Sequence, residues 1–592
     1  MNKMIRLTII CLLFHFSLNA QEQYLVHSHN DYKQELPFWY AYSNGATSIE
    51  VDVFLKDQTL FVTHSEDEIS ESATLESVYL DRLNALLLSG ELRELQLLID
   101  FKSEAYTTIN KLVDVLKEYP ALLKSNKIRF VISGNKPKSE DYIKYPDYIM
   151  FDHQNLNNLE EIDLSKVALI SANYKDYSVW NGYGRMVASE AKQVKNVIEK
   201  AHNISKPIRF WATPDTKTAW LRLSNLGVNY INTDKPALAN QYIKAIEKNT
   251  YHLANKVKTY QPKYDYDEDQ QPQNIILMIG DGNGLAQISA TMIANRGELT
   301  VTKIKNIGLI KTASEDNLIT DSAAGATAMA TGVKTNNRAI GVDSEGKKLN
   351  NLINITKASN FNTAIVSTDA IYGATPSSFF AHRTERDDTK GLVTDLKGSK
   401  LDFFIAGGRS QEKNIEKEFK TERLETFSDF DGQTAIYIGE EKAPTMSKGR
   451  ENTFPTALKK ALKVLDSKEK PFFLMAEGAQ IDNGGHSNNI KGIIEEMLDF
   501  DQAIAEALRF ADANKNTLVL ITADHETSGL GIVGGNIEGT VQADFLTVDH
   551  TGIMVPLFAY GPQADKFTGI YENTMIFKKI LEVLAIKTLM SE

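Results

Sequence analysis

Cysteine is almost absent from this chain of 592 residues, which contains Cys11 and no other. Cys11 lies in a short apolar run, residues 7–16, that follows two basic residues and precedes Ala20. This order is typical of a signal peptide, and we expect residues 1–20 to be removed from an exported, periplasmic or secreted protein. Without Cys11 the mature protein can form no disulfide, and its metal ligands must be His, Asp, Glu or Asn.

Long apolar segments and an excess of positive charge are also absent. The run at residues 7–16 is too short for a membrane span, which takes about 18 or more apolar residues. Lys and Arg number 65 against 77 Asp and Glu, and the net charge is -12. An acidic chain repels nucleic-acid phosphates, which argues against non-specific DNA or RNA binding. A small phosphate ester remains compatible, because a local Arg or a bound metal reverses the field inside a pocket.

The composition that is present, 42% hydrophobic and 24% charged, is that of a folded soluble protein. In the first part of the chain, short apolar runs alternate with longer helical stretches. These runs are residues 24–27, 48–53, 96–101, 128–133, 147–151, 167–171, 207–211 and 229–232. Eight such repeats predict an α/β fold, a (β/α)8 TIM-type barrel over residues 21–246, with its site at the carboxyl ends of the strands.

Polar residues cluster at the ends of the first three runs: His29, Asn30, Glu50, Asp52, His64 and Asp100. Glu50 and Asp52 are two apart on a strand and face the same side, where they repel each other unless a cation intervenes. Asn30 and Asp100 complete an all-oxygen ligand set, which favours Ca²⁺ or Mg²⁺ over zinc. His29 and His64 are then the candidate base and acid. The alternative is that these are ordinary polar residues at strand ends.

These motifs resemble the phosphatidylinositol phospholipase C and glycerophosphodiester phosphodiesterase superfamily over residues 24–245. The His-Arg-Gly usual in the phosphodiesterases after the first strand is missing, and His29-Asn30 is closer to the phospholipase version. The resemblance implies a phosphodiesterase acting on glycerophosphodiesters or inositol phospholipids, with His27 as a rival for the role of His29. A non-catalytic module that binds head groups or glycans is the alternative.

Residues 247–272 differ in character from both flanks. The stretch 261–272 contains charges, amides and two prolines but no aliphatic residue, which predicts a linker. We therefore expect a second domain over residues 273–592.

Two isolated features open this second part. Asp281 follows an apolar strand at 274–279 and starts a glycine-rich turn, a position where open α/β sheets place ligands. Ser322 begins a helix of small residues, where the helix dipole and free amides favour an anion. Ser322 has no histidine near it in the sequence and lies in no Gly-x-Ser-x-Gly motif, so a Ser-His-Asp hydrolase is poorly supported.

Three pairs of Asp and His indicate a metal site. Asp482 and His486 follow an apolar strand at 472–476, Asp524-His525 ends a strand at 517–523, and Asp549-His550 precedes a strand at 554–560. One such pair is usually a structural hydrogen bond. Three beside buried strands, in a mature chain without cysteine, favour metal binding.

Asp-Ser-Ala-Ala at 321–324, Glu-Gly-x-Gln-Ile-Asp-x-x-x-His at 477–486 and Thr-Ala-Asp-His-Glu at 522–526 resemble the alkaline phosphatase family over residues 273–585. The resemblance implies an α/β/α sandwich that hydrolyses small phosphate monoesters through a phosphoserine on Ser322, with Arg386 holding the phosphoryl group. It further implies two Zn²⁺ and one Mg²⁺, held by Asp482, His486 and His550, by Asp281, Asp524 and His525, and by Asp281, Thr375 and Glu477, respectively.

Two positions depart from the family pattern. Gly373 stands where relatives usually carry an Asp or His that supports the magnesium site, and Asn483 replaces a residue that is often Lys, His or Trp. A sulfatase or phosphomutase on the same sandwich is the rival enzyme, but sulfatases need a modified Cys or Ser in a different motif. The sequence leaves the oligomeric state open.

Overall fold

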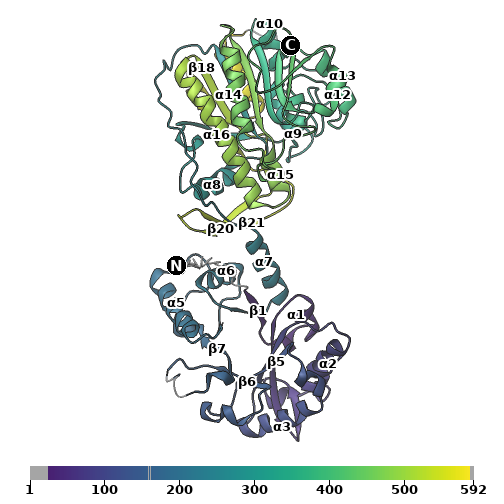
Figure 1. The fold of residues 1–592 in the computed structure, drawn as a ribbon, viewed down its shortest axis with the longest axis vertical. Coiled ribbons are helices and arrows are strands. Elements are labelled where there is room, and N and C mark those ends of the chain that lie inside the picture. Colours follow the sequence, from purple (N-terminus) through teal and green to yellow (C-terminus); the bar gives the residue numbers. More distant parts are fainter. Residues whose placement is uncertain (1–23, 158, 160–161, 587–592) are drawn as a thin grey trace, which may run out of the picture. The chain divides into compact units, whose positions relative to one another are not determined.

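The computed structural model describes residues 24–157, 159 and 162–586, and the predicted signal peptide at 1–20 lies outside this part. The chain divides into two compact units, residues 1–245 and 246–592 (Figure 1). Within the described ranges, no helix has both the length and the apolarity to cross a membrane.

The first unit is a closed parallel barrel, which confirms the predicted fold class. Its eight strands run in the order of the sequence, and β1 closes the ring by pairing with both β2 and β9. They are β1 Leu25–Ser28, β2 Ser48–Lys56, β4 Leu95–Phe101, β5 Ile128–Gly134, β6 Ile149–His153, β7 Val167–Asn173, β8 Ile208–Trp211 and β9 Tyr230–Thr233. Each of the eight expected runs overlaps one of them.

Helices separate most of these strands, and amphipathic spacing explains why they form. In α3, the buried residues Ile109, Leu112 and Leu116 recur at intervals of three and four, and Glu104 caps the first turn. The helices are α1 Trp39–Ser43, α2 Asp81–Leu88, α3 Ala105–Lys117, α4 Pro120–Lys124, α5 Ala188–Asn203, α6 Lys217–Leu226 and α7 Pro236–Lys248.

One strand of this unit does not belong to the barrel ring. Strand β3, Thr59–Val62, turns back antiparallel on β2 and carries the chain to His64. The turn residues Asp57 and Gln58 both have positive φ, 47° and 65°, the conformation that hairpin turns of this length require.

The second unit is an α/β/α sandwich built on a ten-stranded sheet, as expected. The strand order is β15-β16-β14-β13-β17-β11-β18-β23-β12-β24, and β17, β11 and β18 are parallel neighbours at its centre. The strands of this sheet are β11 Asn274–Gly280, β12 Asn306–Lys311, β13 Asn362–Ala370, β14 Phe403–Gly407, β15 Lys420–Glu422, β16 Thr434–Tyr437, β17 Phe472–Gly478, β18 Thr517–Thr522, β23 Val555–Tyr560 and β24 Gly569–Glu572.

The central strand β11 is buried on both faces, as parallel strands between helix layers are. Ile276 and Met278 enter one core with residues of α14 and α16, while Ile275 and Leu277 enter the other with residues of α10 and α17. The helices are α8 Leu285–Ala294, α9 Ser322–Thr331, α10 Leu352–Ala358, α11 Ala374–Ser377, α12 Thr389–Lys397, α13 Glu412–Ile415, α14 Thr453–Asp466, α15 Gln480–His486, α16 Ile490–Asn514 and α17 Thr574–Val583.

Small strands complete this unit. Strand β19, Glu526–Thr527, pairs with β22, His550–Thr551. A second small sheet contains β20 Leu530–Gly535, β21 Thr540–Phe545 and β10 Thr250–His252.

The segment 247–272, expected to be a linker, is bound to the second unit. Its strand β10 pairs with β21. Further along, the Tyr260 hydroxyl donates to Asp512, and the backbone N–H of Tyr264 donates to the Tyr560 hydroxyl. The domain boundaries stay a prediction. These contacts hold much of the segment against the second unit, so it is not a free linker over its whole length.

Candidate active sites

The polar centre of the second unit lies at the carboxyl ends of its central strands. Asp281 directly follows β11, Glu477 is the last residue but one of β17, and Asp524 lies two residues after the end of β18. Since these three strands are adjacent and parallel, their ends bring the carboxylates to one edge of the sheet, where open α/β sheets bind ligands.

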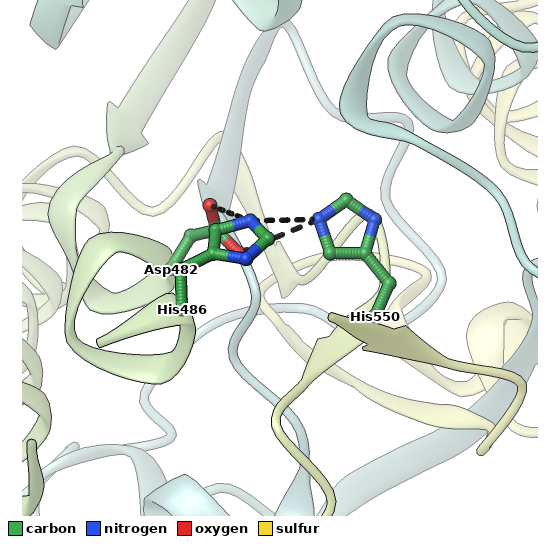
Figure 2. A group of neighbouring side chains, drawn as sticks. All are labelled: Asp482, His486 and His550. Carbon is green, nitrogen blue, oxygen red and sulfur yellow. Dashed lines mark hydrogen bonds and ion pairs between the residues drawn. The ribbon is translucent and has the colours of Figure 1, made fainter. Parts of the chain in front are cut away.

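Asp482, His486 and His550 form one ligand group (Figure 2). Helix α15 places Asp482 and His486 one turn apart, and Asp482 Oδ2 lies 3.1 Å from His486 Nε2. The pairing of β22 with β19 brings His550, whose Nε2 is 3.2 Å from His486 Nε2 and 3.7 Å from Asp482 Oδ1. A carboxylate and two imidazoles are ligands that zinc prefers.

His525 lies at the centre of a second group. Its Nε2 atom is 3.5 Å from Asp281 Oδ1, 3.3 Å from Asp524 Oδ2 and 3.3 Å from the hydroxyl of Ser322. The serine and this histidine are 203 positions apart, and the family resemblance, rather than any local pattern, predicted that they share one site. The arrangement places the candidate nucleophile beside the candidate ligands.

A third group contains oxygen ligands alone. Thr375 Oγ1, Glu477 Oε1 and Asp281 Oδ1 are buried and make no hydrogen bond to any described residue, and the same is true of Asp524 Oδ2. Buried polar atoms without partners are costly, because desolvation is then uncompensated. These orphaned oxygens fit the zinc and magnesium ions that the sequence implied.

The charges at this edge also suit bound cations. Burial raises the pKa of Glu477 to about 8 and that of Asp524 to about 6, and nearby carboxylates add to both shifts. Burial and repulsion from Asp524 raise the pKa of Asp281 well above its usual value. The three groups resist ionising together, and bound cations would remove that resistance.

Neighbouring histidines favour the charged form of the remaining carboxylate, Asp482. Burial alone would raise the pKa of Asp482, but the hydrogen bond with His486 and the neighbouring imidazoles lower it below its usual range. The same hydrogen bond raises the pKa of His486 to about 9.

Arg386 is held in place by the residue before the candidate nucleophile. Asp321 Oδ1 accepts from the N–H of Ala324 and so caps α9, while Asp321 Oδ2 accepts from Arg386 Nη1 at 2.9 Å. The helix N-terminus and the guanidinium fork are therefore both positioned next to Ser322, where they suit an oxyanion.

Thr527 also belongs to this centre, although the sequence motifs did not predict it. Its hydroxyl donates to Asp482 Oδ1 and lies 3.2 Å from His525 Nδ1, so it connects the first two groups. Its position two residues after His525 in a short strand was the one available signal.

In the barrel, Glu50, Asp52 and Asp100 form another ligand group. Asp52 and Asp100 are direct partners in the register of β2 and β4. Arg209 contacts Glu50, while Lys102 Nζ lies 3.4 Å from Asp52 and 3.2 Å from Asp100. Three carboxylates thus face two cationic side chains, and Asp52 Oδ1 and Asp100 Oδ1 are buried without a hydrogen bond to the described residues. The residues fit a bound cation.

Two histidine–carboxylate pairs flank this group. His29 Nδ1 lies 2.8 Å from Asp234, and His64 Nδ1 lies 2.7 Å from Asp52. Burial would lower the pKa of His29, but the hydrogen bond to Asp234 and the charge of Glu50 raise it. The Asn30 side chain contacts His29, with Nδ2 at 3.2 Å, and no described contact joins it to the carboxylates.

His27, the rival of His29, is fully buried, and both of its ring nitrogens contact neighbouring side chains. It lies 2.7 Å from Ser48 Oγ and 2.8 Å from Glu50, and burial lowers its pKa to about 4. His29, with 29% of its side chain exposed, is the histidine that substrate can reach.

Comparison with known families divides the chain in the same way. The family model "Alkaline phosphatase" matches residues 272–414 and 413–544. In the barrel, the model "AIM6-like phosphodiesterase domain" matches residues 18–94, and "Glycerophosphoryl diester phosphodiesterase family" matches residues 207–237.

Individual relatives match the second unit. Alkaline phosphatase 4 of Bacillus subtilis is 30% identical over 407 residues, 52% of this chain and 88% of the relative. The alkaline phosphatase of Escherichia coli is 29% identical over 411 residues, 54% of this chain and 87% of the relative. The solved structure of alkaline phosphatase from the Antarctic bacterium TAB5 is 38% identical, with a TM-score of 0.51, and covers 54% of this chain and 99% of its own.

Proposed function

Because this chain belongs to the alkaline phosphatase family, its second unit is a phosphomonoesterase, and we propose that it acts through a phosphoserine on Ser322. The contact of the Ser322 hydroxyl with His525, beside Asp281 and Asp524, carries the proposal. The oxygen of Ser322 loses its proton and bonds to phosphorus as the alcohol leaves. Water then attacks phosphorus, phosphate departs, and the serine hydroxyl is restored.

The side chains around Ser322 have separate roles. Arg386, fixed by Asp321, binds phosphoryl oxygens, and the N-terminus of α9 stabilises negative charge at the serine. Asp482, His486 and His550 would hold one Zn²⁺, Asp281, Asp524 and His525 the other, and Asp281, Thr375 and Glu477 Mg²⁺. When bound, these cations favour the serine alkoxide and stabilise charge on the attacking and leaving oxygens.

The test is chemical trapping of the intermediate. Acid quenching of the full-length protein with a labelled phosphate monoester should leave label on Ser322. Ser322→Ala should carry no label and lose hydrolysis while keeping its metal content, whereas Ser289→Ala, on α8, should behave as wild type. Equal labelling of Ser322→Ala would exclude the proposed nucleophile.

A second function is supported in the barrel. Two histidine–carboxylate pairs beside a cation-binding group suit phosphodiester cleavage, in which one group accepts a proton and another donates one. We assign these roles to His29 and His64, and the cation, Ca²⁺ or Mg²⁺, to Glu50, Asp52 and Asp100. Glycerophosphodiesters and inositol phospholipids are the substrates to assay. If neither is cleaved with either ion, the barrel is a binding module.

We further propose that the protein is exported and cut after Ala20. Residues 1–20 have the order of a signal peptide, and their removal is tested by N-terminal sequencing of the protein recovered outside the cytoplasm. An N-terminus that still contains Cys11 would contradict this proposal.

A further inference from the structure

Asp369 and Lys442 form an ion pair at the edge of the third oxygen group. Asp369 is buried at the end of β13, and its Oδ1 accepts from the N–H of Ala370 at 2.7 Å. Lys442 Nζ lies 3.4 Å from the same oxygen. Neither residue belongs to the three ligand groups.

Gly373 is the reason that this carboxylate fits. A Cβ atom at residue 373 would lie 2.3 Å from Asp369 Oδ2 and 2.6 Å from Asp369 Cγ, distances that non-bonded atoms do not reach. A side chain at 373 and the observed carboxylate of Asp369 therefore exclude each other. The position that departs from the family pattern is the one that leaves room for Asp369.

A short path joins Asp369 to the ligand Glu477. The backbone N–H of Asp369 donates to Ser367 Oγ at 2.8 Å, and that hydroxyl donates to Glu477 Oε2. The negative charge of Asp369 adds to burial in raising the pKa of Glu477. Burial alone would lower the pKa of Lys442, but attraction to Asp369, Asp281 and Glu477 raises it.

The backbone around Lys442 is closely fitted to the sheet. A Cβ atom at Gly407 would lie 3.0 Å from the Cα of Lys442, and one at Gly439 would lie 2.2 Å from the carbonyl oxygen of Lys442. The next residue, Ala443, donates its N–H to the carbonyl of Thr368 at 3.0 Å, one position before Asp369. The loop is thus fixed to β13 at the point where the ion pair forms.

We propose that Asp369 and Lys442 are positioning residues for the cation held by Asp281, Thr375 and Glu477. This inference rests on the proposed phosphatase function. Mg²⁺ keeps several of its waters in proteins, and a carboxylate beside the site orients them. Lys442 holds that carboxylate in place and offsets its charge.

The experiment is a Mg²⁺ titration of the full-length, zinc-loaded protein, with bound metals counted by elemental analysis. Asp369→Asn should weaken Mg²⁺ binding about 10- to 100-fold without changing the zinc content, a loss typical of residues that act through ligands. Lys442→Met should weaken it less. The matched controls are Asp402→Asn and Lys357→Met. Asp402 and Lys357 form a similar ion pair, and Asp402 also accepts from the N–H of Thr363 at the start of β13. Both variants should bind Mg²⁺ as wild type does.

Moving the carboxylate from residue 369 to residue 373 distinguishes a role in positioning the cation from a role in folding alone. Gly373 has φ −63° and ψ 163°, which any residue adopts, and Asp369→Ala removes the side-chain clash, so that the Cβ of Gly373→Asp keeps one tight contact, 3.0 Å to the carbonyl oxygen of Ala370. The double variant should recover Mg²⁺ affinity that Asp369→Ala alone loses. Wild-type affinity in Asp369→Asn, or no recovery in the double variant, would overturn the inference. Wild-type protein that binds Mg²⁺ but hydrolyses no monoester would instead contradict the proposed function.

Discussion

At the scale of single residues, His550 is positioned by contacts of both ring nitrogens and of its ring face. Its Nδ1 atom lies 2.9 Å from the carbonyl of Thr320, its Nε2 atom faces His486, and its ring stacks on His525 with centroids 3.6 Å apart. The first contact sets the ring so that Nε2 is the nitrogen available for a metal.

Loss of His550 should therefore remove one ligand of one zinc. We expect His550→Ala to bind about one zinc fewer and to lose phosphomonoesterase activity by about 100-fold or more. Elemental analysis and steady-state hydrolysis of a phosphate monoester measure both. His252→Ala, an exposed histidine on β10, is the control. Active wild-type protein without any bound divalent ion would refute the metal assignment altogether.

In the barrel the corresponding residue is Glu50. It is buried, and the charge of Arg209 lowers its pKa despite burial, so it is an anion at neutral pH. Glu50→Gln should reduce Ca²⁺- or Mg²⁺-dependent diesterase activity about 100-fold or more and leave the monoesterase unchanged. Glu94→Gln, an exposed glutamate, should change neither. Full diesterase activity in Glu50→Gln would remove Glu50 from the site.

At the scale of elements, α16 carries a buried acid that affects the pH dependence of stability. Asp501 accepts from the N–H groups of Thr300, at 2.8 Å, and Val301, at 2.9 Å, at the start of the short 3-10 helix Val301–Lys303. Burial, partly offset by these hydrogen bonds, raises its pKa to about 6.

This raised pKa fixes the sign of a stability change. Between pH 4 and 6 folded Asp501 retains a proton that the unfolded chain has lost, so its contribution destabilises the fold increasingly as pH rises. Relative to wild type, Asp501→Asn should therefore gain up to about 3 kcal/mol of unfolding free energy between pH 4 and 7. Denaturant unfolding, followed through the transition of the second unit, measures this difference in unfolding free energy. Exposed Asp267→Asn should show no such gain, and parallel pH profiles of Asp501→Asn and wild type would disprove the assignment.

Helices and strands could be predicted from the sequence where they bury a recognisable run of apolar residues. Strands β11, β17, β18 and β23 are nearly continuous apolar runs, and the barrel strands contain short apolar stretches, so both kinds could be located from the sequence. Strand β3 was missed because its turn uses Asp57-Gln58 in a conformation usually signalled by Asn-Gly.

The candidate ligands were predictable because they lie next to those strands in resembling motifs. Their partners were not. Asp234 reaches His29 across 205 positions, and Lys442, in the segment after β16, reaches Asp369 near the end of β13. The first contact forms only when the barrel closes, and the second only where glycines let a distant backbone segment approach closely. A local sequence pattern shows neither condition.

At the scale of the whole molecule, a phosphatase unit and a barrel with a proposed phosphodiesterase site on one chain suggest consecutive reactions. The barrel would cut a phosphodiester, and the second unit would remove phosphate from the resulting monoester. We expect the intact protein to release phosphate from a glycerophosphodiester. Ser322→Ala should accumulate the monoester, and His29→Ala should leave the diester uncut but hydrolyse added monoester at the normal rate.

The products distinguish this sequence from its alternatives. Chromatography of the reaction separates diester, monoester, cyclic phosphate and free phosphate. Intact protein that stops at a monoester or a cyclic phosphate, or Ser322→Ala that still yields phosphate, would show that the sites do not act in series.

The tyrosines that precede β11 determine where the phosphatase unit can be trimmed. Tyr264 and Tyr266 pack edge-on against Tyr560, with centroids 4.9 and 5.1 Å away, and β10 supplies the outer strand beside β21. A fragment that starts at residue 272, where the family match begins, would uncover the Tyr560 ring and leave an unpaired strand edge, a common origin of aggregation. A soluble fragment should instead begin before Thr250, and a protease that cuts between Thr250 and Tyr266 should do so slowly.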